Sequence, residues 1–171
     1  MAQLVDYSYF KGEWYIKMLW ETEDNLKYRQ EVERYIMRYE SECLKLFLGY
    51  DINDSDNFYN LFMAGKDTES RFIALKNKLV DSTNKVSPIT SYIYHKFWSF
   101  NMTEITTKGR AINKSNSLAE LIVDELALSR SWNAGVDLWN EVFDWLKANS
   151  ETYPEFTAQE CNIKYINHLS I

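Results

Sequence analysis

The chain has 171 residues and a net charge of −6, and 46% of its residues are hydrophobic. This length is typical of one domain, and the hydrophobic content favours a globular protein over a disordered one. The acidic balance argues against electrostatically driven binding to nucleic acids. With five Gly and two Pro, the chain is also too poor in turn residues for a many-stranded β-protein, so we expect long helices.

Residues 1–20 are rich in aromatic side chains and have neither a helical nor a strand period, which predicts an extended N-terminal arm. Aromatic side chains of this size are stabilised when they are buried. The chain's own core or a neighbouring subunit would both cover the arm, and the sequence leaves the two alternatives open. We assign Trp14 and Trp20 as predicted contacts with a partner.

Residues 25–48 have apolar side chains at steps of three and four, from Tyr28 to Phe47, which predicts an amphipathic helix. Gly49 follows the last of them, at the position where glycine commonly ends a helix. The sequence therefore predicts one long helix with a single buried face.

The polar segment 51–57 is superficially similar to a calcium loop. Asp56 replaces the glycine of such a loop and Phe62 replaces its bidentate glutamate, so we do not expect calcium binding. We expect the segment to turn the chain and Asp56 to cap a short helix over 57–64. A third helix is expected over 67–80.

Ser87-Pro88 is a typical helix start, with serine as cap and proline at the first helical position. The helix that it opens ends near Asn101 and is apolar on almost all sides, which predicts a central, buried helix. His95 lies within it, and we interpret this histidine as a core or rim residue because no catalytic partner lies at a useful spacing.

A β-hairpin is predicted over 103–114, because Thr and Ile favour strands and Lys108-Gly109 suits a two-residue turn. This turn would place Ile105 opposite Ile112. An isolated hairpin is marginally stable in water, so we expect it to pack on helices or on another molecule. The predicted contacts are Ile105, Lys108, Gly109, Arg110 and Ile112.

Ser117 and Glu120 form a capping-box pattern that opens the longest predicted helix, 118–149, which the Ser129-Arg-Ser131 stretch and Gly135 could bend. The tail, 150–171, has no clear helix, and we expect its Tyr153 and Phe156 to dock on partners. The predicted fold is mainly α: a single domain over 1–171, with a bundle of about five helices, one projecting β-hairpin, and extended N- and C-terminal arms.

No catalytic or cofactor motif is found. Nucleophilic catalysis needs an activated Ser, Cys or Thr, and His95 and His168 have no such signature around them. Cys43 and Cys161 match no metal or redox spacing, and with no secretory signal we expect both to be reduced thiols. We therefore predict no catalytic residue, no metal, no cofactor and no enzymatic activity. No apolar stretch is long enough for a membrane span, so no membrane partner is expected.

Six stretches occur in a characteristic order along the chain. They are Glu33-Arg-Tyr-Ile36 leading to Leu44, Leu48 and Gly49; FYNLF at 58–62; SPITSYIYHKFW; the Thr-Thr-Lys-Gly turn; WNAGVDLWNEVFDWL; and ANSETYPEF. Together they resemble the small head–tail connector proteins (adaptors, or neck rings) of tailed phages, with the nearest versions in crAss-like and related phages of Bacteroidota. The contact of the 103–114 hairpin would then be with a neighbouring subunit or the adjacent ring. The similarity covers about 28–156, while the aromatic arm and the 51–57 loop do not match the pattern.

This resemblance implies a structural virion protein of the phage neck, made in the host cytoplasm. Many copies, typically twelve, would form a ring beneath the portal, extend the DNA channel and present a platform for the next neck or tail protein. Genomic DNA would pass through without sequence-specific binding. Two competing hypotheses remain. The first is a helical nucleic-acid-binding or regulatory phage protein, which would need a basic face. The second is an enzyme without a recognisable motif, which would need a polar cleft with His95 or His168 beside a carboxylate.

Overall fold

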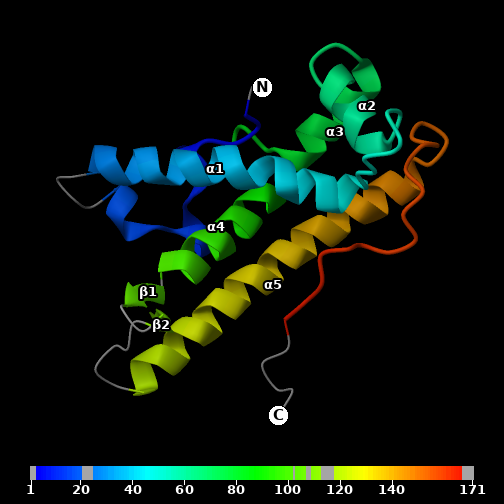
Figure 1. Ribbon diagram of the computed structural model, residues 1–171. Coiled ribbons are helices and arrows are strands. Elements are labelled where there is room, and N and C mark those ends of the chain that lie inside the picture. The colour runs from blue at the N-terminus through cyan, green and yellow to red at the C-terminus, as the bar shows by residue number, and fades with distance from the viewer. Residues whose placement is uncertain (1–2, 21–24, 102, 107–108, 113–117, 167–171) are drawn as a thin grey trace.

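The computed structural model describes residues 3–20, 25–101, 103–106, 109–112 and 118–166 (Figure 1). Helices dominate this part of the chain, which confirms the prediction of a mainly α-helical fold with about five helices. The helices are α1 (Asn25–Leu48), α2 (Phe58–Gly65), α3 (Ser70–Leu79), α4 (Pro88–Asn101) and α5 (Leu118–Ala148). Strands β1 (Thr103–Thr106) and β2 (Gly109–Ile112) lie between α4 and α5 in the chain. Three short 3₁₀ turns, at Tyr7–Tyr9, Gly12–Trp14 and Lys17–Leu19, precede α1.

Helix α1 follows the predicted apolar pattern. Val32, Ile36, Tyr39 and Cys43 are buried along one face, at the spacing of successive helical turns. The chain leaves the helix at Gly49, whose φ of 78° lies in the left-handed region that glycine adopts without a steric penalty. Both the extent and the end of this helix were predicted correctly.

Helix α4 lies between α1 and α5 and packs against both (Figure 1). Its buried residues include not only Ile93 and Phe97 but also the polar Thr90 and Ser91. Ser87 begins the helix as expected: its Oγ accepts a hydrogen bond from the Ile89 N–H at 3.3 Å and donates one to the Leu79 carbonyl at 2.9 Å. The prediction of a central helix is confirmed.

Gly135 of α5 is the point of closest approach to α4. A methyl group added to Gly135 would lie 2.1 Å from Ser91 Oγ, well inside van der Waals contact. The missing side chain of Gly135 therefore makes room for the crossing of α4 over α5.

The short helices begin later than predicted. The cap of α2 is Asn57, not Asp56: Asn57 Oδ1 accepts the Asn60 N–H at 3.0 Å, and the side chain is buried. Helix α3 begins at Ser70 because the carbonyl of Gly65 accepts the N–H groups of Thr68 and Glu69, at 3.0 and 2.8 Å. That tight turn occupies residues that the apolar pattern assigned to α3.

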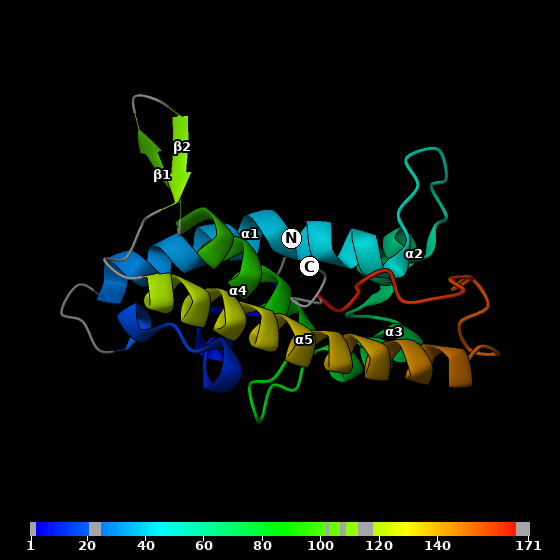
Figure 2. The same cartoon turned by 90° about the horizontal axis from the view of Figure 1, so that it is seen from below.

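Strands β1 and β2 pair in an antiparallel manner, with Ile105 opposite Arg110 and Thr103 opposite Ile112. The predicted pairing of Ile105 with Ile112 is wrong, because the register places Thr106 opposite Gly109. Lys108 and the Ser117 capping box lie outside the described residues. Figure 2 shows the two strands standing out from the helical body beyond the end of α4.

Candidate interaction site

The N-terminal segment is fastened to α1 through its backbone. The N–H groups of Leu4 and Val5 donate to the Glu40 carboxylate at 3.0 to 3.2 Å, and the Tyr7 N–H donates to Glu33 Oε1 at 3.0 Å. Glu40 is buried, and burial raises its pKa above the ordinary value of 4.5 although the two backbone donors lower it. The arm therefore packs on the chain's own core, in three 3₁₀ turns and not as an extended strand.

Trp14 is part of that core. Its side chain is buried, and its indole Nε1–H donates to the Ser131 carbonyl of α5 at 3.1 Å. A side chain enclosed by its own subunit offers little surface to a partner in this conformation, and the contact of Trp14 with a partner stays a prediction.

Trp20 differs from Trp14 because 40% of its surface is exposed. Its Nε1–H donates to the Phe10 carbonyl at 3.2 Å, which fixes the indole on the surface. The Arg29 guanidinium lies 5.8 Å from the Trp20 ring and 4.6 Å from the Tyr7 ring, within the range of cation–π attraction. Trp20 therefore remains available as a predicted contact.

Tyr153 and Phe156, the predicted contacts of the tail, are also buried in the chain's own core. The Tyr153 hydroxyl donates to the Arg71 carbonyl at 2.6 Å, and Arg71 Nη1 lies 3.0 Å from both carboxylate oxygens of Glu155. The Phe156 ring centroid lies 5.3 Å from that of Phe58. Both side chains therefore offer little surface to a partner in this conformation, and their docking on partners stays a prediction.

The rest of the described tail runs back along α5 (Figure 1). The Trp132 indole N–H donates to the Lys164 carbonyl at 2.8 Å, and the side chain of Asn133 exchanges two hydrogen bonds with the backbone of Ile166. Residues 150–166 contain no helix, as predicted.

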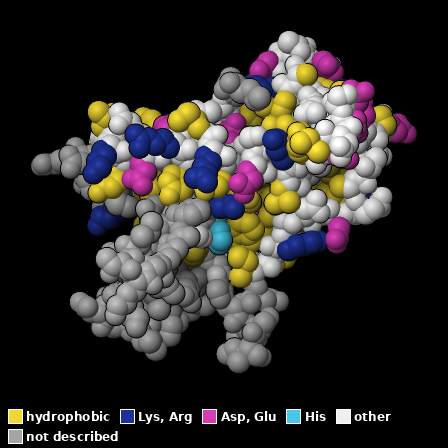
Figure 3. All heavy atoms as spheres, in the orientation of Figure 1, with side chains coloured by type: hydrophobic (Ala, Val, Ile, Leu, Met, Phe, Trp, Pro, Cys, Tyr) yellow, Lys and Arg dark blue, Asp and Glu magenta, His cyan; other side chains and the backbone are white. Residues whose placement is uncertain are grey.

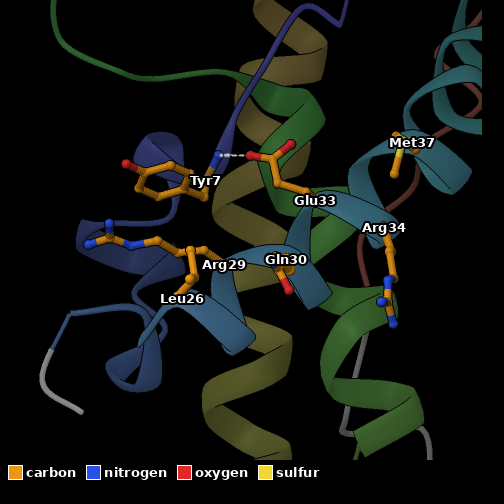
Figure 4. Close-up of a pocket in the computed structure, with 7 residues that line it drawn as sticks. All are labelled: Tyr7, Leu26, Arg29, Gln30, Glu33, Arg34 and Met37. Carbon is orange, nitrogen blue, oxygen red and sulfur yellow. Dashed lines mark hydrogen bonds between the residues drawn. The ribbon is translucent and has the colours of Figure 1, made fainter. Parts of the chain in front are cut away.

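A groove on the outer face of α1, of about 650 Å³, was missed by the sequence analysis (Figure 4). A smaller hollow of about 160 Å³ adjoins it through Arg34. The signal was present in the sequence, because Leu26 and Met37 are apolar residues outside the buried stripe of this helix, but exposed single apolar residues are common and were not weighed. The groove is lined by Tyr7, Leu26, Arg29, Gln30, Glu33, Arg34 and Met37.

His95 was the candidate for an enzymatic site. Its ring centroid lies 4.7 Å from that of Trp132, and Ser99 Oγ lies 3.5 Å from Nδ1. Burial lowers its pKa from the ordinary 6.5. Among the described residues no carboxylate pairs with this imidazole; His168 lies outside them.

The cysteines are free thiols buried in the core. Within the ranges that the structure describes, no group of three or more His, Cys, Asp or Glu side chains is placed to hold a metal ion. No helix in the same part of the chain has the length and apolar character needed to span a membrane.

Comparisons with known proteins identify no relative: no protein-family model, no curated protein and no solved structure matches the chain.

Proposed function

We propose that this chain is a structural subunit of the neck of a tailed phage. Many copies would form a ring between the portal at the capsid vertex and the next neck or tail protein, and the ring would extend the channel through which the genome passes. The subunit would act by binding its neighbours and would carry out no chemistry.

The observation that carries this proposal is the coincidence between the connector-like stretches and the elements of the fold. Glu33 to Gly49 covers the last two thirds of α1 and its glycine end. Residues 58–62 fall within α2, and the SPITSYIYHKFW stretch forms the start and body of α4. The Trp132–Leu146 stretch forms the second half of α5, and ANSETYPEF forms the turn after it. Each of these stretches falls within one helix and its ends, or in the turn after it. This favours an architecture shared with the connector proteins over chance similarity of separate segments.

A second support is the form of the subunit. Strands β1 and β2 stand out near one end of α1, and the loop after α1 stands out at the other end, on the same side of the body (Figure 2). Elements that extend from a packed helical body are suited to reach neighbouring subunits. A heterologous (head-to-tail) interface that repeats from subunit to subunit forms a ring when the rotation between neighbours closes.

Quantitative mass spectrometry of purified phage particles tests the proposal directly. The copy number of this chain is compared with that of the portal protein in the same particles. A fixed ratio near one supports a ring matched to the portal. If the chain is absent from particles and remains free in the lysate, the connector function is rejected.

A nucleic-acid-binding or regulatory protein remains the second candidate, because Lys and Arg side chains gather over α1 on the face shown in Figure 3. Such binding would weaken steeply with salt, since displacement of counterions drives it. A DNA mobility shift that disappears as salt is raised, together with absence from particles, would favour this alternative over the connector.

A further inference from the structure

The groove on α1 combines exposed apolar side chains with arginines. Leu26 is 66% exposed and Met37 is 64% exposed, and both belong to the same face of the helix as Arg29 and Arg34 (Figure 4). The Glu33 carboxylate accepts the Tyr7 N–H, so one of its oxygens is already engaged. Two large apolar side chains left in water beside cations are typical of a surface that receives a partner.

The loop after α1 is complementary to the groove, because it combines an exposed apolar side chain with acidic residues. Ile52 is 81% exposed, and Asp51, Asp54 and Asp56 surround it in sequence without any basic residue. Within the described residues, none of these three aspartates forms an ion pair, and neither does Arg34. An exposed isoleucine between unpaired carboxylates matches a groove that offers leucine, methionine and guanidinium groups.

Hydrogen bonds within the loop fix its shape before any partner arrives. Asn57 Nδ2 donates to the carbonyls of Asp51 and Asp54, at 3.0 and 2.5 Å. The Asn53 N–H donates to Asp51 Oδ1, and the Asp56 N–H donates to Asp54 Oδ1, both at 2.9 Å. A preorganised loop loses little conformational entropy on docking, which favours binding.

We propose that loop 51–56 of one copy docks in the α1 groove of a second copy, with Ile52 against Met37 and the loop aspartates beside Arg34 and Arg29. This inference rests on the proposed function, because it names the surface through which subunits of the ring would meet. Charge complementarity selects the occupant, since docking of Ile52 also brings the loop aspartates to Arg34, which forms no ion pair among the described residues.

A second copy fits the groove better than a nucleic acid does. Phosphates would engage the arginines but would leave Leu26 and Met37 uncovered and would meet the carboxylate of Glu33. The loop and the groove are different surfaces on different parts of the chain, so a single contact leaves one loop and one groove free. Further copies can then add in the same manner, as a closed ring requires.

Disulfide trapping between two singly substituted chains tests the contact. Full-length Ile52→Cys and Met37→Cys proteins are mixed at high concentration and oxidised, and the mixed dimer is quantified by mass spectrometry. Cys43 and Cys161 are buried, so the introduced thiols are the accessible ones. We expect the 52–37 product to exceed, by about tenfold, the product of a matched control in which Val86→Cys, also exposed in a loop, replaces Ile52→Cys.

Arg34→Glu in the Met37→Cys chain is expected to reduce the 52–37 product about tenfold through repulsion between like charges. The matched control is Leu46→Asp in the same chain, because Leu46 is an exposed residue of α1 outside the groove and its substitution should leave the yield unchanged. Circular dichroism shows that each variant is folded. A 52–37 yield no higher than that of the Val86→Cys control, with folded proteins, overturns the proposed contact.

The contact and the connector function fail separately. If the chain is present in particles at a fixed ratio to the portal but no specific 52–37 product forms, the proposed contact is rejected and the connector function is retained. Specific trapping by a chain that is absent from particles supports the contact and rejects the connector. Specific trapping in a species whose mass is that of a closed dimer supports the contact and rejects its use in a ring.

Discussion

Gly135 and Ser91 meet where α5 crosses α4, and a methyl group at Gly135 would lie 2.1 Å from Ser91 Oγ and 2.2 Å from Ser91 Cβ. Ser91 cannot turn away easily, because it is buried and its Oγ donates to the Pro88 carbonyl at 2.7 Å. The crossing therefore depends on the absence of a side chain at a single position.

Gly135→Ala is expected to lower the free energy of unfolding by about 1–3 kcal/mol, the usual range for overpacking a core. An alanine in an unobstructed helix would instead stabilise it by up to about 1 kcal/mol, so the sign of the effect identifies the clash. Urea unfolding measures it. Ser91→Gly in the same chain removes the opposing Cβ and should recover part of the loss; if Gly135→Ala alone is stabilising, the close crossing is disproved.

Glu40 predicts a pH dependence of stability. Burial raises the pKa of this carboxyl in the folded state above 4.5, so the folded chain binds more protons than the unfolded chain between 4.5 and the raised pKa. The contribution of Glu40 to stability is therefore complete below 4.5 and is lost as the pH rises through the folded-state pKa.

The variant Glu40→Gln cannot ionise and should lack this decline while keeping an oxygen acceptor for Leu4 and Val5. Urea unfolding at a series of pH values from 4 to about 8 compares it with the parent chain and with Glu141→Gln, an exposed control on α5. Equal pH slopes for Glu40→Gln and the parent chain would show that Glu40 is not the group responsible.

Tyr153→Phe separates a core role from a docking role for the tail. The hydroxyl donates to the Arg71 carbonyl at 2.6 Å, so its removal should cost about 0.5–1.5 kcal/mol of stability. Tyr165→Phe is the matched control, because that hydroxyl bonds Asp137 and Asn140 at the surface and its loss should cost less. Unchanged stability of Tyr153→Phe, with impaired assembly, would support Tyr153 as a partner contact.

Cys43 and Cys161 should react slowly with thiol reagents in the folded protein. Both are buried, and burial raises the pKa of each thiol, which leaves less of the reactive thiolate at neutral pH. Labelling followed by mass spectrometry should find both thiols free, unmodified in buffer and fully modified in urea. Rapid native labelling of Cys43, whose side chain is enclosed, would contradict the packing of α1.

The long helices could be predicted because their signals are local. The apolar stripe of α1 with Gly49, and the Ser87-Pro88 start of α4, each lie within a few residues of the feature that they determine. The turn at Gly65 and the cap at Asn57 were assigned a few residues wrongly, since several polar residues in succession could have served and only the fold selects among them.

The contacts of the aromatic residues could not be predicted in the same way. Trp14 bonds to Ser131, and Tyr153 bonds to Arg71, partners separated in sequence by 117 and 82 positions. Composition indicates that such side chains must be covered, but it does not distinguish cover by the same subunit from cover by another. The groove was missed for the opposite reason, because Leu26 and Met37 attract notice only once the buried face of α1 is known.

The packing of the tail makes completion of the core depend on a segment without helix. Phe156 lies against Phe47, Phe58 and Phe143, with ring centroids 6.3, 5.3 and 5.8 Å apart, and Asn162 Nδ2 reaches back to the Leu46 carbonyl at 3.1 Å. A chain that has formed its helices but has not docked this segment leaves the three phenylalanine rings without one of their neighbours. Docking of the tail, and not the formation of any helix, is therefore the step that closes this end of the core.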